Sequence, residues 1–143
     1  MTIKKQGSAQ WRGSLKKGKG TVSTESGALA ENPYGFNTRF EGQPGTNPEE
    51  LIGAAHASCY SMALSMILGE ENLEPESIDT RATVTLEQDD SGFTISAIHL
   101  ETVAKIPDAD QATFETCANK AKEGCPVSKL FKAEITLDAK LAN

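Results

Sequence analysis

The stretch that decides the fold is residues 46–69, T-N-P-E-E-L-I-G-A-A-H-A-S-C-Y-S-M-A-L-S-M-I-L-G, which predicts one long helix. Thr46 or Asn47 can cap its N-terminus, because a short polar side chain accepts a bond from a free backbone N–H. Pro48 suits the first turn, where no N–H is required. Gly69 is expected to follow the last turn as the left-handed residue.

Cys59 lies near the middle of this helix, and an apolar setting alone would raise the pKa of its thiol. A reactive Cys59 therefore needs a partner. Arg39, in the segment N-T-R-F before the helix, is the best candidate, and an ordinary surface arginine is the alternative. His56 lies one turn before Cys59; it predicts either a Cys–His pair for acyl transfer or a buried helix histidine. Apolar residues at steps of three and four predict that the buried face contains Ile52, Ala55, Cys59, Met62 and Met66.

The rest of the chain predicts an α+β domain with a largely antiparallel sheet and two main helices, the first long and central, as a single domain over residues 1–143. The signals are β-prone runs with period two, turn residues and helix starts. Strands are expected at 3–11, 21–25, 37–40, 81–87, 93–106 with a bulge near 97–98, and 133–141; turns at 13–20, 31–35 and 89–92; and helices at 108–122 and from Cys125.

Composition excludes several classes of function. The net charge of −6 argues against a nucleic-acid partner, which requires a basic patch. The sequence has neither an apolar leader nor a run of 18 apolar residues, so we expect a cytoplasmic protein with no membrane partner. The histidines and cysteines lack metal-ligand spacing, and no cofactor fingerprint is present, so no metal or cofactor is expected. The run G-S-L-K-K-G-K-G from Gly13 lacks the Ser or Thr and the following helix of a phosphate-binding loop.

Glu49 cannot reach Cys59 within one chain, because ten helical residues span about 15 Å. The residues between them are small, G-A-A-H-A-S from Gly53 to Ser58. Two copies crossing antiparallel near position 54 would bring Glu49 of one chain to Cys59 of the other. The alternative is that these small residues pack on the chain's own sheet or second helix.

Cys125 occupies a helix start in G-C-P-V-S, where unpaired N–H groups favour a thiolate. The alternative for both Cys59 and Cys125 is a small buried hydrophobic residue. Cys117 lies among alanines in the middle of a predicted helix and is interpreted as a packing residue. The three cysteines of the chain do not predict a structural disulfide framework, because cytosolic disulfides are more often transient and catalytic.

The motifs T-N-P-E-E-L-I-G-A-A-H-A-S-C and G-C-P-V-S closely resemble the OsmC/Ohr family of thiol peroxidases. The similarity extends over nearly the whole chain through G-K-G-T-V-S-T-E-S-G, P-Y-G-F-N-T-R-F-E-G and K-A-E-I-T-L-D. The A-H-A-S-C form and the arginine of N-T-R-F fit the OsmC branch better than the organic-hydroperoxide-resistance branch.

The resemblance implies a mechanism. Cys59 would be the peroxidatic cysteine, whose thiolate attacks the O–O bond of a hydroperoxide and becomes a sulfenic acid. Cys125 would be the resolving cysteine and form a disulfide with it. Arg39 would stabilise the thiolate and polarise the leaving oxygen, and Glu49 would hold Arg39 by a charged hydrogen bond. His56 matches the motif, but no catalytic role is assigned to it.

The resemblance also implies the biological setting: defence against oxidative or osmotic stress, an intertwined homodimer, organic hydroperoxides preferred over hydrogen peroxide, and a dithiol reductant of the lipoyl type. Proximity in sequence suggests a substrate pocket lined by Phe36, Phe40, Tyr60 and Met62. A redox sensor or binding module, in which the same thiols oxidise without cycling, is the alternative from a different class.

Overall fold

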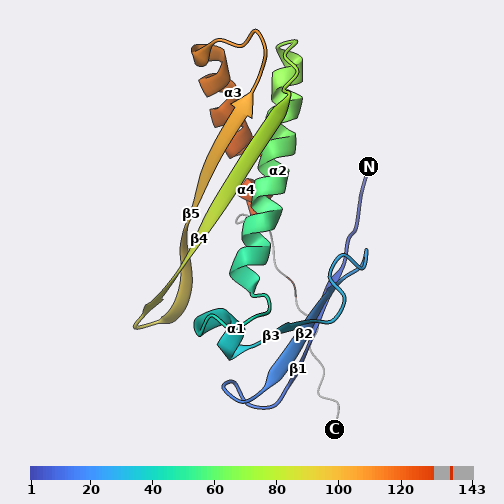
Figure 1. The fold of residues 1–143 in the computed structure, drawn as a ribbon, viewed down its shortest axis with the longest axis vertical. Helices are drawn as coiled ribbons and strands as arrows, with labels where there is room; N and C mark the ends of the chain where they lie inside the picture. Colours follow the sequence, from blue (N-terminus) through green and yellow to red (C-terminus); the bar gives the residue numbers. More distant parts are fainter. Residues whose placement is uncertain (131–135, 137–143) are drawn as a thin grey trace. The chain divides into compact units, whose positions relative to one another are not determined.

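The computed structural model describes residues 1–130 and 136, which form two compact units. The first unit is Met1–Ile52 and the second begins at Gly53. Figure 1 shows the elements in chain order. They are β1 (Gly7–Arg12), β2 (Lys19–Thr24), β3 (Asn32–Tyr34), α1 (Phe36–Phe40), α2 (Pro48–Glu70), β4 (Ser77–Asp89), β5 (Gly92–Lys105), α3 (Gln111–Gly124) and α4 (Pro126–Lys129). The expected closing strand at 133–141 lies outside the described residues.

The first unit is built on a three-stranded antiparallel sheet in the order β1-β2-β3. The predicted hairpin between the first two strands is confirmed, and its loop folds back tightly at Gly18. A Cβ there would lie 2.3 Å from the Ser14 carbonyl oxygen, so only glycine fits. The predicted turn at 31–35 is wrong, because Asn32–Tyr34 pairs with β2 as a strand. Pro33 is tolerated there because β3 is at the edge of this sheet.

The predicted strand at 37–40 is also wrong, because Phe36–Phe40 forms the short helix α1. Thr38 explains the difference. Its hydroxyl accepts a bond from the Gly35 N–H at 2.8 Å and donates to the Thr46 carbonyl at 2.8 Å. These contacts close a turn that overrides the β preference of the Thr and Phe side chains. The helix places Arg39 in its last turn.

The long helix is confirmed as α2, with Asn47 as its cap. The Asn47 side-chain oxygen accepts a bond from the Glu50 N–H at 2.9 Å. The predicted end at Gly69 is wrong, since the helix continues to Glu70. Asn72 takes the left-handed conformation, with φ of 58°. Asparagine tolerates this conformation better than most residues, which explains why no glycine is needed.

The predicted buried face of α2 is wrong. The helix buries Gly53, His56, Tyr60, Leu64 and Leu68. Met62 and Met66 are 77% and 64% exposed. Apolar side chains are spread almost evenly around this helix, so periodicity could not select a face.

The second unit packs α2 and α3 beside the β4–β5 hairpin (Figure 1). Its core joins Tyr60, Leu64 and Leu68 of α2 to Cys117 and Ala121 of α3. The inward-facing residues of β4 alternate with exposed ones, as predicted. The turn at 89–92 and the bulge are also confirmed. Thr85 pairs with Ala97 and Leu86 pairs with Ile95, so one residue of β5, Ser96, is left without a partner in β4.

The second helix begins three residues later than expected, because Asp110 caps it. The Asp110 carboxylate accepts a bond from the Thr113 N–H at 2.8 Å. The predicted short helix after Cys125 is confirmed as α4. The chain has an α+β architecture with two antiparallel sheets in the described residues rather than one.

By length and composition, α2 could cross a membrane, although no uninterrupted run of 18 apolar residues was found in the sequence. Core helices pass the same test, so one such helix is weak evidence. Tyr60, Leu64 and Leu68 of α2 pack in the core of the second unit with α3, as the residues of a core helix do.

Candidate active site

An arginine–carboxylate pair lies in the first unit, between α1 and the first turn of α2. The Arg39 Nε donates to the two carboxylate oxygens of Glu49 at 3.1 and 3.2 Å, and a second guanidinium nitrogen also donates to Glu49. The Glu49 side chain is 13% exposed and that of Arg39 34%. Such a two-bond pair fixes the guanidinium plane and leaves its other N–H groups available to a ligand.

An apolar hollow of about 180 Å³ adjoins Arg39 within the same unit. Phe36 and Phe40, expected to line a pocket from their place in the sequence, do line it. Tyr60 instead lies in the core, where its hydroxyl donates to the Ala118 carbonyl at 3.1 Å, and Met62 is exposed. The sequence did not predict the contributions of the first hairpin and strand β3. All the lining residues are Trp11, Leu15, Tyr34, Gly35, Phe36, Arg39, Phe40 and Pro48.

The second unit brings Cys59 and Cys125 together. Both thiols are free, and the Cys59 and Cys125 side chains interact with each other. Cys59 is half-buried on α2, whereas Cys125, between α3 and α4, is 0% exposed. Two neighbouring thiols can form a disulfide, and only the one that reaches the surface can meet a substrate first.

The pKa values of the two thiols are shifted in opposite directions. Burial raises the pKa of Cys59, a backbone bond from Val127 acts against this, and the neighbouring Cys125 raises it further. Burial also acts to raise the pKa of Cys125, yet its pKa is lowered overall by the hydroxyl and amide of Ser128 and by Cys59. The negative charge of the pair is therefore favoured on Cys125.

Ser128 is the site residue that sequence reasoning missed. Its hydroxyl donates to the Cys125 sulfur at 3.5 Å and lies 2.8 Å from the Nε2 of His56. Its position in C-P-V-S, three residues after Cys125, was the available signal. His56 is 5% exposed, and burial lowers its pKa, so the ring is neutral near neutral pH. Among the described residues, His56 has no hydrogen bond to Cys59.

Cys117 behaves as expected for a packing residue. It is 2% exposed in the core of the second unit, beside Ala121, Leu64 and Leu68. Among residues 1–130 and 136, no group of three or more His, Cys, Asp or Glu side chains is arranged to hold a metal ion.

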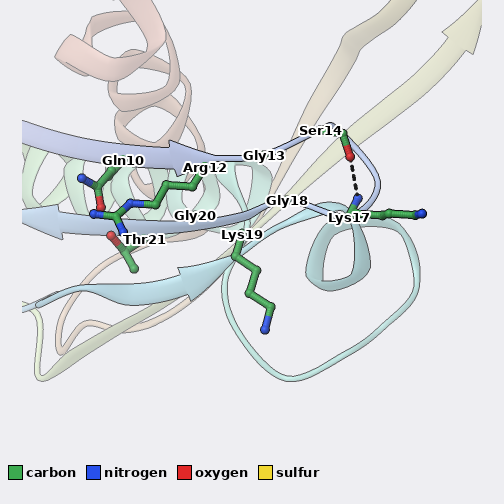
Figure 2. Close-up of a pocket in the computed structure, with 9 residues that line it drawn as sticks. All are labelled: Gln10, Arg12, Gly13, Ser14, Lys17, Gly18, Lys19, Gly20 and Thr21. Carbon is green, nitrogen blue, oxygen red and sulfur yellow. Dashed lines mark hydrogen bonds between the residues drawn. The ribbon is translucent and has the colours of Figure 1, made fainter.

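The β1–β2 hairpin has a second, open hollow (Figure 2). Figure 2 shows Lys17 and Lys19 extending in different directions from the loop. The only bond drawn there joins the Lys17 N–H to the Ser14 hydroxyl at 3.3 Å. These two side chains do not point toward one another.

Comparison with known proteins decides the family. The sequence pattern of the family described as OsmC-like protein matches residues 40–140. The chain belongs to the OsmC family. This OsmC-family chain is also 61% identical over 141 residues to the Peroxiredoxin OsmC of Escherichia coli (strain K12), covering 99% of each chain.

The more distant branch of the family is also similar to this OsmC-family chain. The organic hydroperoxide resistance protein OhrB of Bacillus subtilis (strain 168) is 31% identical over 123 residues, covering 85% of this chain and 88% of the relative. The crystal structure of OhrB from B. subtilis has a TM-score of 0.65, at 30% identity, covering 89% of this chain and 90% of that one. The α+β fold with antiparallel sheets is therefore the OsmC/Ohr fold.

Proposed function

We propose that this OsmC-family chain is a cysteine-dependent peroxidase that reduces organic hydroperoxides to alcohols. The observation that carries the proposal is the contact between a half-buried thiol, Cys59, and an enclosed one, Cys125. The names of the similar proteins, a peroxiredoxin and an organic hydroperoxide resistance protein, support the same chemistry.

Cys59 is the peroxidatic residue in this proposal. Its thiolate attacks one oxygen of the hydroperoxide, the O–O bond breaks, and the alkoxide leaves with a proton as the alcohol. Cys59 is left as a sulfenic acid. Cys125 then attacks the Cys59 sulfur, the S–O bond breaks, and a disulfide and water form. An external dithiol reduces the disulfide and restores both thiols.

Arg39 supplies the charge that Cys59 lacks. Burial makes the Cys59 thiolate unfavourable, so a cation beside it is required before it can react at neutral pH. The bonds from Glu49 hold the Arg39 guanidinium in one orientation. The apolar hollow beside Arg39 suits the organic part of a hydroperoxide, which favours an organic substrate over hydrogen peroxide.

We propose that the active unit is a homodimer in which the Arg39–Glu49 pair of one copy serves Cys59 of the other. Exposed Met62 and Met66 on α2 support this, as apolar surface that a second copy would cover. The small residues of α2 are divided between two roles. Gly53 is buried against β4 of its own chain, whereas Ala54 and Ala55 are exposed. Sedimentation as a strict monomer at micromolar concentration would remove this part of the proposal.

The domain extent, localisation, reductant and physiological role are proposed from the family resemblance. We propose one peroxidase domain over residues 1–143, in the cytoplasm, with a lipoyl-type dithiol as reductant and a role in oxidative or osmotic stress. Turnover with dihydrolipoamide, compared with a monothiol, tests the reductant. A monothiol that supports equal turnover would contradict the lipoyl assignment.

The decisive experiment counts thiols. One equivalent of cumene hydroperoxide should consume two thiols per chain, and a peptide map without reductant should join Cys59 to Cys125 rather than to Cys117. Cys59→Ser should abolish peroxide consumption, with Cys117→Ser as the matched control that preserves it. Thiol loss that continues in Cys59→Ser would overturn the proposal.

Two other functions predict different results. A redox sensor would oxidise once without cycling, so repeated turnovers with a dithiol exclude it. Acyl transfer by Cys59 and His56 needs His56 as a base on Cys59, but among the described residues neither ring nitrogen bonds to that thiol: Nε2 is engaged by Ser128 and the buried Nδ1 has no hydrogen-bond partner. Absence of a thioester after treatment with an activated ester would exclude that function too.

A further inference from the structure

A chain of polar side chains leads from α2 to the Cys125 sulfur and is not used in the mechanism above. The Nε2 of His56 lies 2.8 Å from the Ser128 hydroxyl, and that hydroxyl donates to Cys125 at 3.5 Å. His56 and Cys125 are 5% and 0% exposed. Keeping a buried polar chain costs free energy unless its members satisfy one another, so the arrangement calls for an explanation.

The proton positions follow from the donors. Ser128 has one hydroxyl hydrogen, and it points to the Cys125 sulfur. With that hydrogen directed to Cys125, the Ser128 oxygen accepts from His56 in the tautomer that carries its one ring hydrogen on Nε2, which leaves the buried Nδ1 as an acceptor without a hydrogen-bond partner. Each donor therefore points toward Cys125, which is the polarity that stabilises a thiolate rather than a thiol.

Building on the proposed peroxidase function, we propose that Ser128, oriented by His56, is a positioning residue that keeps Cys125 ready as a thiolate for disulfide formation. The thiolate attacks the Cys59 sulfur of the sulfenic acid. The S–S bond forms, the S–O bond breaks, and the departing hydroxide takes a proton to become water. The hydroperoxide is the only oxidant in these two reaction steps, and neither Ser128 nor His56 is oxidised or reduced.

Other groups near Cys125 do not replace Ser128. Cys59 and Tyr60 of α2 also face it among the described residues. Cys59 interacts with Cys125 as a thiol, but in the resolving step the Cys59 sulfur is the atom that Cys125 attacks. The Tyr60 hydroxyl donates to the Ala118 carbonyl instead. Ser128 is thus the side-chain donor that remains for Cys125 at the moment of attack.

The test follows the resolving step alone. The full-length chain receives one equivalent of cumene hydroperoxide, and samples are quenched with dimedone to trap the sulfenic acid. We expect Ser128→Ala to consume peroxide as fast as wild type but to form the disulfide about tenfold more slowly near neutral pH. The pH midpoint of disulfide formation should rise by about one unit, since the thiolate has lost a donor.

Two variants make the comparison specific. Ser128→Thr keeps the hydroxyl and should restore both the rate and the pH midpoint. Ser61→Ala is the matched control, because it removes another half-buried hydroxyl of the same unit, one that bonds to the Ala57 carbonyl and to Thr80. Its pH midpoint should equal that of wild type. A midpoint raised equally in Ser61→Ala would overturn the inference.

His56→Leu tests the orientation of Ser128 and serves if Ser128→Ala does not fold. It should raise the pH midpoint by less than Ser128→Ala, and it should have no further effect in combination with Ser128→Ala. An unchanged midpoint in both Ser128→Ala and His56→Leu, with a normal wild-type disulfide, would overturn this inference alone. Failure of wild-type Cys59 to be oxidised would instead overturn the proposed function.

Discussion

The surroundings of Cys59 and Cys125 differ in a way that burial does not explain. Cys125 is fully enclosed, which by itself would make it the weaker acid. It is nevertheless the thiol whose pKa is lowered, because Ser128 donates to its sulfur. Cys59 is more exposed, yet its pKa is raised. Burial acts to raise the pKa of both thiols, and at Cys125 the hydrogen bonds from Ser128 outweigh it.

The difference teaches what each half of the site still requires. Cys125 obtains its donor within its own unit, from a residue three positions along the chain. Cys59 has access to solvent but lacks a cation among the groups that shift its pKa. In the proposed peroxidase, Arg39 would supply this cation, and Glu49 already holds its guanidinium in position.

Among the substitutions that test this comparison, Cys125→Ser should have the largest effect on turnover. The first round of peroxide consumption should continue, because Cys59 still provides the attacking sulfur. Turnover with dihydrolipoamide should then stop, with the sulfenic acid persisting or oxidising further. Dimedone labelling followed by mass spectrometry checks this. Sustained turnover at the wild-type rate would show that another thiol resolves Cys59.

Arg39→Met should lower the rate of the first step by about a hundredfold near neutral pH, the size expected for losing a charged donor. Because the Cys59 pKa is raised, its thiolate is scarce at neutral pH and increases as pH rises. Without Arg39 the pH profile moves further upward, so the defect should shrink in alkali. Stopped-flow rates with cumene hydroperoxide measure it. An equal loss at every pH would assign Arg39 to the leaving oxygen alone.

Glu49→Gln should have a smaller effect, about tenfold on the same rate. The amide can accept only at its single oxygen, so the Arg39 guanidinium loses one of its fixed bonds but keeps its charge. In an Arg39→Met background the change should have almost no further effect. A double-mutant cycle on the first-step rate tests this, and full additivity would contradict the role of Glu49 as a positioning residue.

Cys117→Ala should be the mildest change, because this thiol is a core residue rather than a redox group. Loss of its sulfur should reduce the free energy of unfolding by about 1 kcal/mol. Peroxide consumption and the Cys59–Cys125 disulfide should be unaffected. Urea denaturation and a peptide map measure the two. A lost disulfide in the folded variant would contradict this interpretation of Cys117.

The sequence predicted the features that local chemistry determines. The helix α2, the short helix after Cys125 and the β4–β5 hairpin follow from caps, Pro48 and Pro126, and period-two alternation. The buried face of α2 could not be predicted, because the helix is apolar on every side. The α1 helix could not be predicted either, because it depends on hydrogen bonds of Thr38 with Gly35 and Thr46, which residue propensities do not describe.

The candidate site divides in the same way. Arg39, Glu49, Cys59 and Cys125 were found through motifs, and the structure brings Arg39 to Glu49 and Cys59 to Cys125. The catalytic roles of these residues remain predictions. Ser128 was missed because its contact with His56 joins residues 72 positions apart, which only the packing of α4 against α2 creates.

The enclosure of Cys125 also governs how the enzyme is reset. In the disulfide, a reductant from solvent can approach the Cys59 sulfur, whereas Cys125 has no exposed surface. The mixed disulfide should therefore form on Cys59, with Cys125 as the leaving group. A thiol of lowered pKa leaves faster. The hydrogen bond from Ser128 would therefore speed reduction of the Cys59–Cys125 disulfide as well as its formation.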